Sequence, residues 1–264
     1  MQPISSRANE RVKAIRSLKE RRARDDTGTF FAEGWRVVAA ALDTGATINL
    51  GVIAPDRLDE REAEIANRLM DAGVPLLEVT GDVFDTMSFR EEGQSVGAVV
   101  DQRWEPLTSA IEGRRCWVAL NEIQHPGNLG TVIRTCDASG GDGVILSGRS
   151  TDPYHPVAVR GSLGSIFSQR IVRAGPADFE NWATSSGAMV IGTSPAGTLD
   201  YREVAYRAPV VLIMGNERIG ISDAQAALCE HVVRIPMSGY VESLNLSIAA
   251  ALVLYEIERQ TRTV

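Results

Sequence analysis

The sequence predicts an α/β protein of two domains. Helical and extended patterns alternate along its 264 residues, which is typical of helices packed on sheets. From residue 115 onward the strands change character and become short, continuous apolar runs. A polar stretch with Trp104, Glu105 and Pro106 separates the two parts. We therefore expect an N-terminal α/β domain at 1–100, a linker at 101–113 and a C-terminal α/β domain with a parallel sheet at 114–264.

The composition allows real hydrophobic cores, because 44% of the residues are hydrophobic. No apolar run approaches the roughly 18 to 20 residues of a membrane span, and the basic N-terminus lacks a following apolar stretch. We expect a cytoplasmic protein. The cysteines, Cys116, Cys136 and Cys229, are odd in number and far apart, so we expect reduced thiols and no metal.

The first 24 residues carry a net charge of +6, although the whole chain carries −7. Val12, Ile15 and Leu18 give them an apolar stripe at helical spacing, which predicts an amphipathic basic helix. Its cations form either a solvated helix face or an arm that contacts phosphates. The candidate contacts are Arg7, Arg11, Lys13, Arg16, Arg21 and Arg22, and Lys19 and Arg24 complete the cations of the segment.

The elements of the N-terminal domain follow from short extended runs bounded by turn residues and from helical spacing between them. The expected strands are 29–33, 48–54, 75–79 and 96–100, and the expected helices are 34–42, 57–72 and 81–87.

The C-terminal domain has continuous apolar strands separated by helices, which predicts a parallel sheet covered on both faces. The expected strands are 116–120, 143–147, 188–193, 210–214 and 232–235, and the expected helices are 129–139, 156–167, 177–185 and 223–230. Ligands collect at the carboxyl ends of such strands. Three polar clusters follow strands of this sheet.

The first cluster follows strand 116–120. Pro126 and Gly127 signal a turn, and Asn128 stands where a helix cap belongs. A helix that starts there carries Arg134 in its second turn, and Gly130 leaves room for a ligand. The segment is either a capped turn with a surface arginine or part of a binding site.

The second cluster follows strand 210–214. Gly215 and Gly220 bracket Asn216 and Glu217, so the backbone can bend tightly and expose its N–H and C=O groups. The spacing is that of neither a Walker A loop nor a dinucleotide-binding loop, so nucleotide phosphates are not its expected ligand.

The third cluster lies between 235–237 and an apolar run at 248–255, which we expect to be a helix buried on every face. Ser243 can cap that helix. Capping then leaves Asn245 and Ser247 unexplained, and polar groups that enter a core need partners. They bind either the backbone of a packed loop or a ligand.

Together the three clusters resemble the three motifs of the SpoU (TrmH-type) branch of the SPOUT methyltransferases. These enzymes methylate ribose 2′-hydroxyls in RNA with S-adenosylmethionine. The matching positions are Pro126, Gly127, Asn128, Gly130 and Arg134, then Gly215, Glu217 and Gly220, then Ile235, Pro236, Met237, Ser243, Leu244, Asn245 and Ser247.

The resemblance implies a C-terminal trefoil knot, a cofactor held in the knotted loops, and a homodimer with sites near the subunit interface. The N-terminal domain resembles the L30e-like substrate domain of many relatives, and the stretch around Arg160 resembles a family segment near the RNA. The implied cofactor-binding residues are Thr193, Gly215, Asn216, Ile235, Met237, Ser243 and Leu244.

The resemblance also implies a role for Arg134 in activating the ribose hydroxyl. Because an arginine is always protonated, we expect it to orient the phosphate or to stabilise the developing alkoxide. The remaining catalytic candidates, which hold the ribose and the loops, are Asn128, Glu217, Ser243 and Asn245. No metal is needed, and we expect His125, His155 and His231 to be structural.

Ribosomal RNA is the expected substrate, with 23S RNA favoured and a role in antibiotic resistance open, because the two-domain layout and basic arm resemble the rRNA-modifying relatives. A tRNA 2′-O-methyltransferase and a non-catalytic RNA-binding protein are the alternatives.

Overall fold

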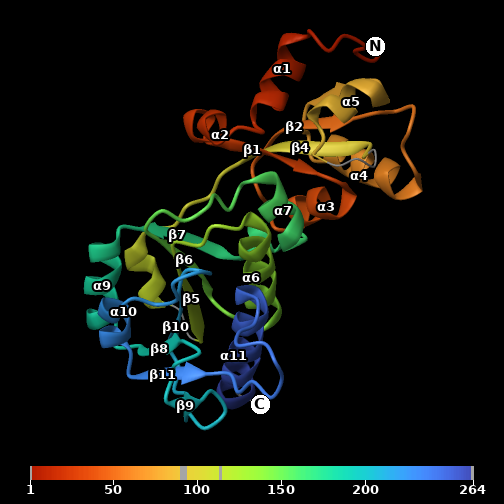
Figure 1. Cartoon of the computed structure of the whole chain (residues 1–264). Helices are drawn as coiled ribbons and strands as arrows, with labels where there is room; N and C mark the ends of the chain where they lie inside the picture. Colours follow the sequence, from red (N-terminus) through yellow and green to blue (C-terminus); the bar gives the residue numbers. More distant parts are fainter. Residues whose placement is uncertain (1, 90–93, 113–114, 263–264) are drawn as a thin grey trace. The chain divides into compact units, whose positions relative to one another are not determined.

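The computed structural model describes residues 2–89, 94–112 and 115–262, and the chain forms two compact units (Figure 1). The N-terminal unit contains residues 1–102 and 152–168, and the C-terminal unit contains 103–151 and 169–264. Segment 152–168, expected within the C-terminal domain, thus packs with the N-terminal unit. The expected linker holds the last residue of a strand, Asp101, and a short 3₁₀ helix, η1 (Leu107–Glu112).

The N-terminal unit is built on a sheet in the order β1-β4-β2-β3. Strand β4 runs antiparallel to β1 and β2, and β3 runs parallel to β2. The strands are β1 (Thr29–Glu33), β2 (Ile48–Ile53), β3 (Leu76–Glu78) and β4 (Val96–Asp101), and the helices are α1 (Glu10–Ser17), α2 (Arg21–Thr27), α3 (Trp35–Asp43), α4 (Glu60–Asp71), α5 (Gly81–Met87), α7 (Pro156–Ser162) and α8 (Ser165–Ser168).

Helix α4 and the helix expected at 156–167 differ from their expected bounds for local reasons. Helix α4 begins three residues late because Asp59 forms a capping box with Glu62: the Glu62 N–H donates to Asp59 Oδ1 at 2.8 Å. The helix expected at 156–167 breaks between α7 and α8, where Leu163 and Gly164 have φ angles of 50° and 100°. A Cβ at Gly164 would lie 2.5 Å from the Cβ of Ala40, so this turn requires glycine.

A buried ion pair holds segment 152–168 in the N-terminal unit. Arg24 is 1% exposed, and its Nη2 lies 2.7 Å from Asp152 Oδ2. The guanidinium also donates to the carbonyls of Leu18 and Lys19. Arg24, counted among the cations of the basic segment, is therefore an internal structural group.

The C-terminal unit contains a seven-stranded sheet among its described residues, in the order β7-β6-β5-β10-β8-β11-β9. Every neighbouring pair is parallel, as predicted. Two of its strands were not expected, β7 (Arg170–Ala174) and β9 (Leu199–Asp200). The other strands are β5 (Cys116–Asn121), β6 (Gly143–Ser147), β8 (Met189–Thr193), β10 (Val210–Met214) and β11 (His231–Arg234).

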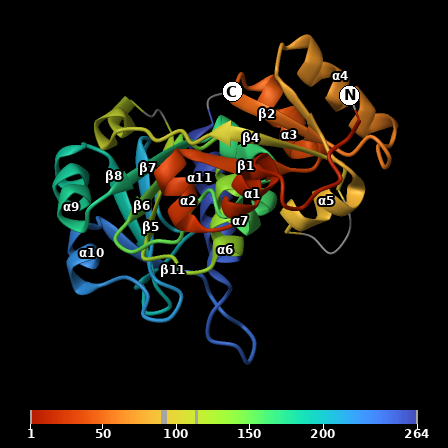
Figure 2. The same ribbon diagram turned by 90° about the horizontal axis from the view of Figure 1, so that it is seen from above.

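Helices cover both faces of this sheet, as expected for continuous apolar strands. Figures 1 and 2 show α6 (Pro126–Ala138) and α11 (Leu246–Thr261) on one face, and α9 (Pro176–Ser185) and α10 (Asp223–Leu228) on the other. Beneath α9, the side chains of Trp117, Phe179 and Trp182 belong to one hydrophobic core cluster. The three polar clusters therefore lie at the carboxyl ends of the strands, which the helices do not cover.

Helix α11 is buried on one side only, so the expectation of burial on every face is wrong. Ala250, Val253 and Ile257 are buried, but Ile248, Leu252 and Tyr255 are 50%, 38% and 51% exposed. Because these three residues are spaced by four and three positions, they form one stripe along the helix. No helix in the described parts of the chain is long and apolar enough to cross a membrane.

Candidate active site

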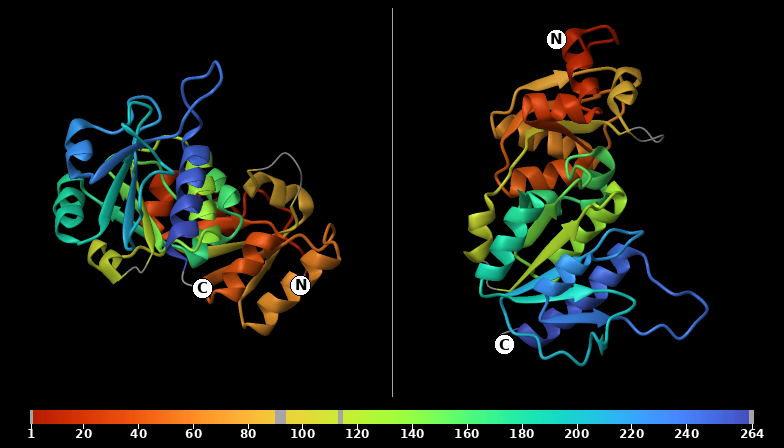
Figure 3. Two further views of the ribbon diagram at one scale, coloured as in Figure 1. Left: turned by 90° about the horizontal axis from the view of Figure 1, so that it is seen from below. Right: turned by 60° about the vertical axis from the view of Figure 1, so that its left-hand side comes forward.

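A cavity of about 590 Å³ opens in the C-terminal unit at the carboxyl ends of β8, β10 and β11. Its walls come from the loops that follow β5, β8, β10 and β11, which the parallel sheet brings to one edge. Figure 3 shows the loop between β11 and α11 projecting from the sheet. All the predicted cofactor-binding residues line the cavity: Thr193, Gly215, Asn216, Ile235, Met237, Ser243 and Leu244.

The loop after β10 folds back on itself. The Asn216 N–H donates to the Gly220 carbonyl at 3.0 Å, and the Gly220 N–H donates to the Asn216 carbonyl at 2.9 Å. A Cβ at Gly215 would lie 2.0 Å from the carbonyl carbon of Gly220, so no side chain fits there. The amide of Asn216 donates to the Glu122 carbonyl at 2.9 Å, so it ties this loop to the one after β5.

A chain of hydrogen bonds joins the three motif loops. Asn128 Nδ2 donates to Glu217 Oε1 at 3.3 Å, and Asn245 Nδ2 donates to Asn128 Oδ1 at 3.0 Å. Asn245 Oδ1 accepts from both the backbone N–H and the hydroxyl of Ser247, at 2.9 and 2.7 Å. Segments 89 and 117 residues apart in sequence are therefore held in one geometry on the cavity wall.

These contacts correct two assignments of helix caps. Helix α6 begins at Pro126 with His125 as its cap residue, so Asn128 lies inside its first turn. Helix α11 is capped by Asn245 and not by Ser243. Asn245 and Ser247, which capping left unexplained in the sequence, satisfy each other at the helix start. Ser243 is exposed on the cavity wall.

Glu217 is the anchor of the loop after β5. Its carboxylate accepts the backbone N–H groups of Gln124 at 3.1 Å and His125 at 3.2 Å. Burial raises the pKa of this carboxyl, but the hydrogen bonds from Gln124, His125 and Asn128 lower it, and the net pKa lies below its ordinary value. The group is therefore a stable anionic acceptor and is unsuited to act as a proton donor near neutral pH.

Arg134 does not line the cavity. Because α6 begins at Pro126, Arg134 falls more than two turns into the helix, where its side chain is exposed. Among the described residues no hydrogen bond or ion pair holds its guanidinium. A single chain thus brings Asn128, Glu217, Ser243 and Asn245 together and leaves Arg134 outside.

The cations of the basic segment differ in exposure and in whether a carboxylate neutralises them. Arg21 and Arg22 lie 3.5 and 3.6 Å from Asp25 and Asp26, which offset their charge. Lys13 pairs with Glu10. Arg7 and Arg11 are exposed, Arg16 is half-buried, and Arg160 is exposed at the end of α7.

Several cavity residues were not predicted from the sequence. Ser194 directly follows Thr193, and Ile221 directly follows Gly220. Their positions next to predicted site residues are the sequence feature that could have identified them. Thr193 itself directs its hydroxyl to the Ile213 carbonyl at 3.4 Å. The described residues contain no group of three or more His, Cys, Asp or Glu side chains that could hold a metal ion.

Comparisons with known proteins match both parts of the chain. Residues 115–255 match the SpoU rRNA Methylase family, and residues 9–98 match the MRM3-like substrate binding domain. The chain is 30% identical to the 23S rRNA (guanosine(2553)-2′-O)-methyltransferase RlmP of Bacillus subtilis, over 97% of this chain and 99% of that protein. It is also 30% identical to the 23S rRNA (uridine(2479)-2′-O)-methyltransferase of Streptomyces viridochromogenes, over 92% and 87%.

A solved structure is similar over the full length. The AdoMet-bound rRNA methyltransferase from Sinorhizobium meliloti superposes with a TM-score of 0.88 at 38% identity, covering 98% of this chain and 97% of that chain.

Proposed function

The chain belongs to the SpoU rRNA methylase family, and from this premise we propose that it transfers a methyl group from S-adenosylmethionine to a ribose 2′-hydroxyl of ribosomal RNA. The observation that carries the proposal is the cavity whose walls are joined by the Glu217–Asn128–Asn245 hydrogen bonds. A protein that only bound RNA would need neither this cavity nor these bonds.

The cavity fits the proposed cofactor. Its volume of about 590 Å³ is in the usual range for sites that hold a ligand of this size. Ile235, Met237 and Leu244 supply apolar surface for a purine, and the tight bend at Gly215 keeps backbone groups accessible. Thr193, Asn216 and Ser243 complete the set that would hold it. When bound, S-adenosylmethionine supplies an activated methyl group on its sulfonium sulfur.

The protein's own residues orient the nucleophile. Asn128 and Asn245 fix the wall next to the cofactor loops, and Glu217 holds the loop after β5 in place. Arg134 stays protonated and stabilises the negative charge that develops on the 2′-oxygen, or holds the adjacent phosphate. Positioning of the two reactants supplies a large part of the rate enhancement.

The protein acts as a homodimer in this proposal. The exposed stripe of Ile248, Leu252 and Tyr255 on α11 supports an apolar interface. Arg134 lies outside its own cavity, which is accounted for if the site is completed by Arg134 of the partner subunit. Leu252→Glu is expected to give monomers by light scattering, whereas Met70→Glu, at an exposed position on α4, leaves the dimer intact. Dimers of the Leu252→Glu protein would contradict this interface.

The remaining parts of the proposal concern the fold and the RNA. The match to a substrate binding domain supports an RNA-binding role for the N-terminal unit, with Arg7, Arg11, Arg16 and Arg160 as contacts. A trefoil knot around the motif loops is also part of the proposal, and the match to the SpoU family over residues 115–255 supports it. We also propose that the protein works in the cytoplasm, where a bacterium such as Bacillus subtilis keeps the 23S RNA that its relative methylates.

The two curated relatives name 23S RNA, which favours this substrate over tRNA, and they name different bases. The test uses tritiated S-adenosylmethionine with separate pools of unmodified ribosomal RNA and tRNA. Label in the 23S fraction is expected. Label confined to tRNA would select the tRNA alternative, and absence of both label and cofactor binding by calorimetry would reject the enzyme.

A further inference from the structure

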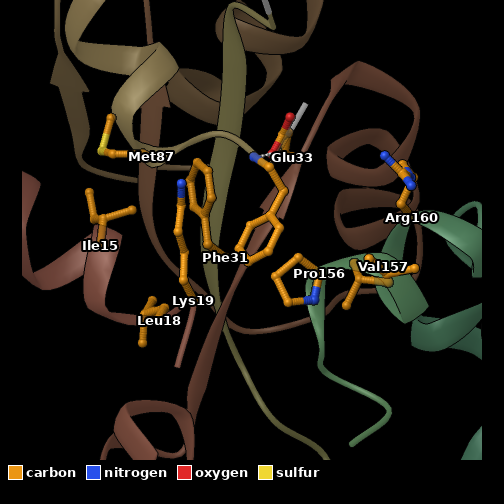
Figure 4. A pocket seen from close by; sticks show the side chains of 11 residues that line it. Ile15, Leu18, Lys19, Phe31, Glu33, Met87, Pro156, Val157 and Arg160 are labelled. Atoms are coloured by element: carbon orange, nitrogen blue, oxygen red, sulfur yellow. Dashed lines mark hydrogen bonds between the residues drawn. The ribbon is translucent and has the colours of Figure 1, made fainter. Parts of the chain in front are cut away.

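The N-terminal unit has a shallow depression between its own sheet and α7. Figure 4 shows Lys19 on one side of it and Arg160 on the other, with Phe31 and Pro156 between them. The enclosed volume is about 20 Å³, room for a single water molecule, so a ligand must lie on this surface and cannot be enclosed by it. The lining combines apolar side chains with cations at the rim.

An aromatic ring at this depression is both exposed and fixed. Phe89 is 39% exposed. Its backbone N–H donates to Glu33 Oε2 at 2.9 Å. Its ring centroid lies 5.9 Å from that of His155 in an edge-to-face arrangement, and Lys19 Nζ lies 5.0 Å from the same Phe89 centroid. A lone exposed phenylalanine is ordinary. A phenylalanine held in place by a carboxylate, an imidazole and an ammonium group offers a preorganised stacking surface.

The charges around the ring suit an anion. Lys19 donates to the Ser88 carbonyl at 2.6 Å and is half-buried. Burial lowers the pKa of its ammonium group, while Glu33 raises it and Arg16 lowers it. Glu33 is the one acidic residue among the described residues that line the depression, and it already accepts from the Ser88 hydroxyl and the Phe89 N–H. Lys19 and Arg160 therefore give the lining two positive charges against the one negative charge of Glu33.

We propose that this depression is a nucleotide subsite, in which an unpaired base of the RNA substrate stacks on Phe89 while a phosphate lies against Lys19 or Arg160. The proposal rests on the RNA methyltransferase function and names a part of the substrate that is bound away from the methylated ribose. An aromatic face accepts any base, so the subsite contributes affinity and register and does not read sequence.

Segment 152–168 gives the subsite its second wall. Pro156, Val157 and Arg160 belong to α7, which the buried Arg24–Asp152 pair fixes to the N-terminal unit. The stretch that the sequence places inside the catalytic domain therefore contributes to the substrate surface.

The experiment measures methylation kinetics of Phe89→Ala with deproteinised total ribosomal RNA. Base stacking on an aromatic side chain has a strength that corresponds to a roughly 5- to 150-fold change in affinity. We expect KM for RNA to rise by that factor, with kcat and cofactor affinity by calorimetry close to those of the unaltered protein. Met70→Ala, an exposed apolar position on α4, should leave KM unchanged.

A second variant reports stacking directly. Phe89→Trp should keep a near-normal KM, and its additional tryptophan fluorescence should be quenched by the same RNA. Lys19→Gln should lower the slope of log affinity against log salt by about one phosphate contact. A KM for Phe89→Ala within twofold of normal, together with unquenched fluorescence, overturns the subsite.

The two levels of the proposal fail differently. If the unaltered protein methylates no RNA, the proposed function fails, and RNA quenching of Phe89→Trp still tests the subsite alone. If Phe89→Ala does not fold, quenching of Phe89→Trp and the salt slope of Lys19→Gln decide: both effects support the subsite, and the absence of both overturns it.

Discussion

At the residue scale, a substitution of Arg134 should affect methyl transfer without affecting cofactor binding. Its side chain is exposed and lies outside the cavity. Arg134→Ala should therefore leave cofactor affinity by calorimetry and the unfolding midpoint unchanged, because no described contact is lost. Methylation should fall by about 100-fold or more, the size expected when a group that stabilises developing charge is removed.

Arg149→Ala is a matched control, because Arg149 is also an exposed arginine of the C-terminal unit and is absent from the cavity wall. Its methylation rate should stay near normal. Loss of folding in Arg134→Ala, or unchanged methylation, would contradict the role given to Arg134.

Glu217 predicts a pH-dependent contribution to stability. Its folded pKa is depressed, so the charged form is favoured by folding, and the stabilisation is present above its unfolded value near 4.5. It is lost as pH falls through the lower folded pKa. Glu217→Gln should cost about 1 to 2 kcal/mol of unfolding free energy at pH 7, because hydrogen bonds to a charged group are replaced and the site is partly exposed.

Urea unfolding of both proteins at pH 7 and at pH 3.5 measures this difference. The gap should narrow at the lower pH. A gap that stays constant or widens would show that Glu217 does not act through its charge.

At the element scale, the start of α11 is coupled to α6. Asn245 caps α11 and donates to Asn128, so removing its side chain affects both helices. Asn245→Ala should cost about 1 kcal/mol from the cap. In a double-mutant cycle with Asn128→Ala, the two changes should be non-additive by about 0.5 kcal/mol or more.

The matched control is Asn9→Ala, which removes the cap of α1 in the other unit. Its effect should add to that of Asn128→Ala within experimental error, as measured by urea unfolding. Additivity of Asn245→Ala with Asn128→Ala would mean that the hydrogen bond between the two amides carries no energy.

The element scale also shows where pattern reasoning succeeds. Strands β6 and β10 have the predicted bounds because each contains a short continuous apolar run, which is typical of a strand buried on both faces of a covered parallel sheet. Strand β7 was not predicted because it lies at the edge of the sheet, where Arg170 and Arg173 interrupt the apolar run. The cap of α11 was misplaced because serine and asparagine cap equally well, so residue type alone does not select between Ser243 and Asn245.

At the scale of the whole molecule, a buried ion pair helps to hold segment 152–168 in the N-terminal unit, together with the contacts of Phe30 with Tyr154 and Phe167. Asp152 and Arg24 are 128 residues apart and nearly inaccessible to solvent. Removing one partner of such a pair leaves a buried unpaired charge. Asp152→Asn should therefore lower the unfolding free energy by about 3 to 5 kcal/mol. The increase in backbone hydrogen-exchange rate caused by this substitution should be largest in residues 152–168.

Asp26→Asn is the control, because Asp26 faces Arg22 in an exposed pair 3.6 Å apart. Exposed pairs contribute about 0 to 1 kcal/mol. Equal costs for the two substitutions, measured by denaturant unfolding, would show that burial adds nothing to the Arg24–Asp152 pair.

At the same scale, sequence patterns predict where the strand ends gather, but they do not predict which distant segments pack together. A parallel sheet gathers the carboxyl ends of its strands on one side, so the sequence alone allows the three clusters to be assigned to one binding site. The membership of 152–168 depends on a contact between distant residues, and no periodicity reports it. For the same reason the charged arm was overestimated: helical spacing shows that Val12 and Ile15 are buried, but it does not show that Arg24 turns inward.

The central claim, methylation of a ribose 2′-hydroxyl, is tested most directly by alkaline hydrolysis of ribosomal RNA labelled by this protein with tritiated S-adenosylmethionine. A 2′-O-methyl group blocks cleavage of the following phosphodiester. We predict that the label appears in alkali-stable dinucleotides. Label recovered in mononucleotides would place the methyl group on a base and contradict the account.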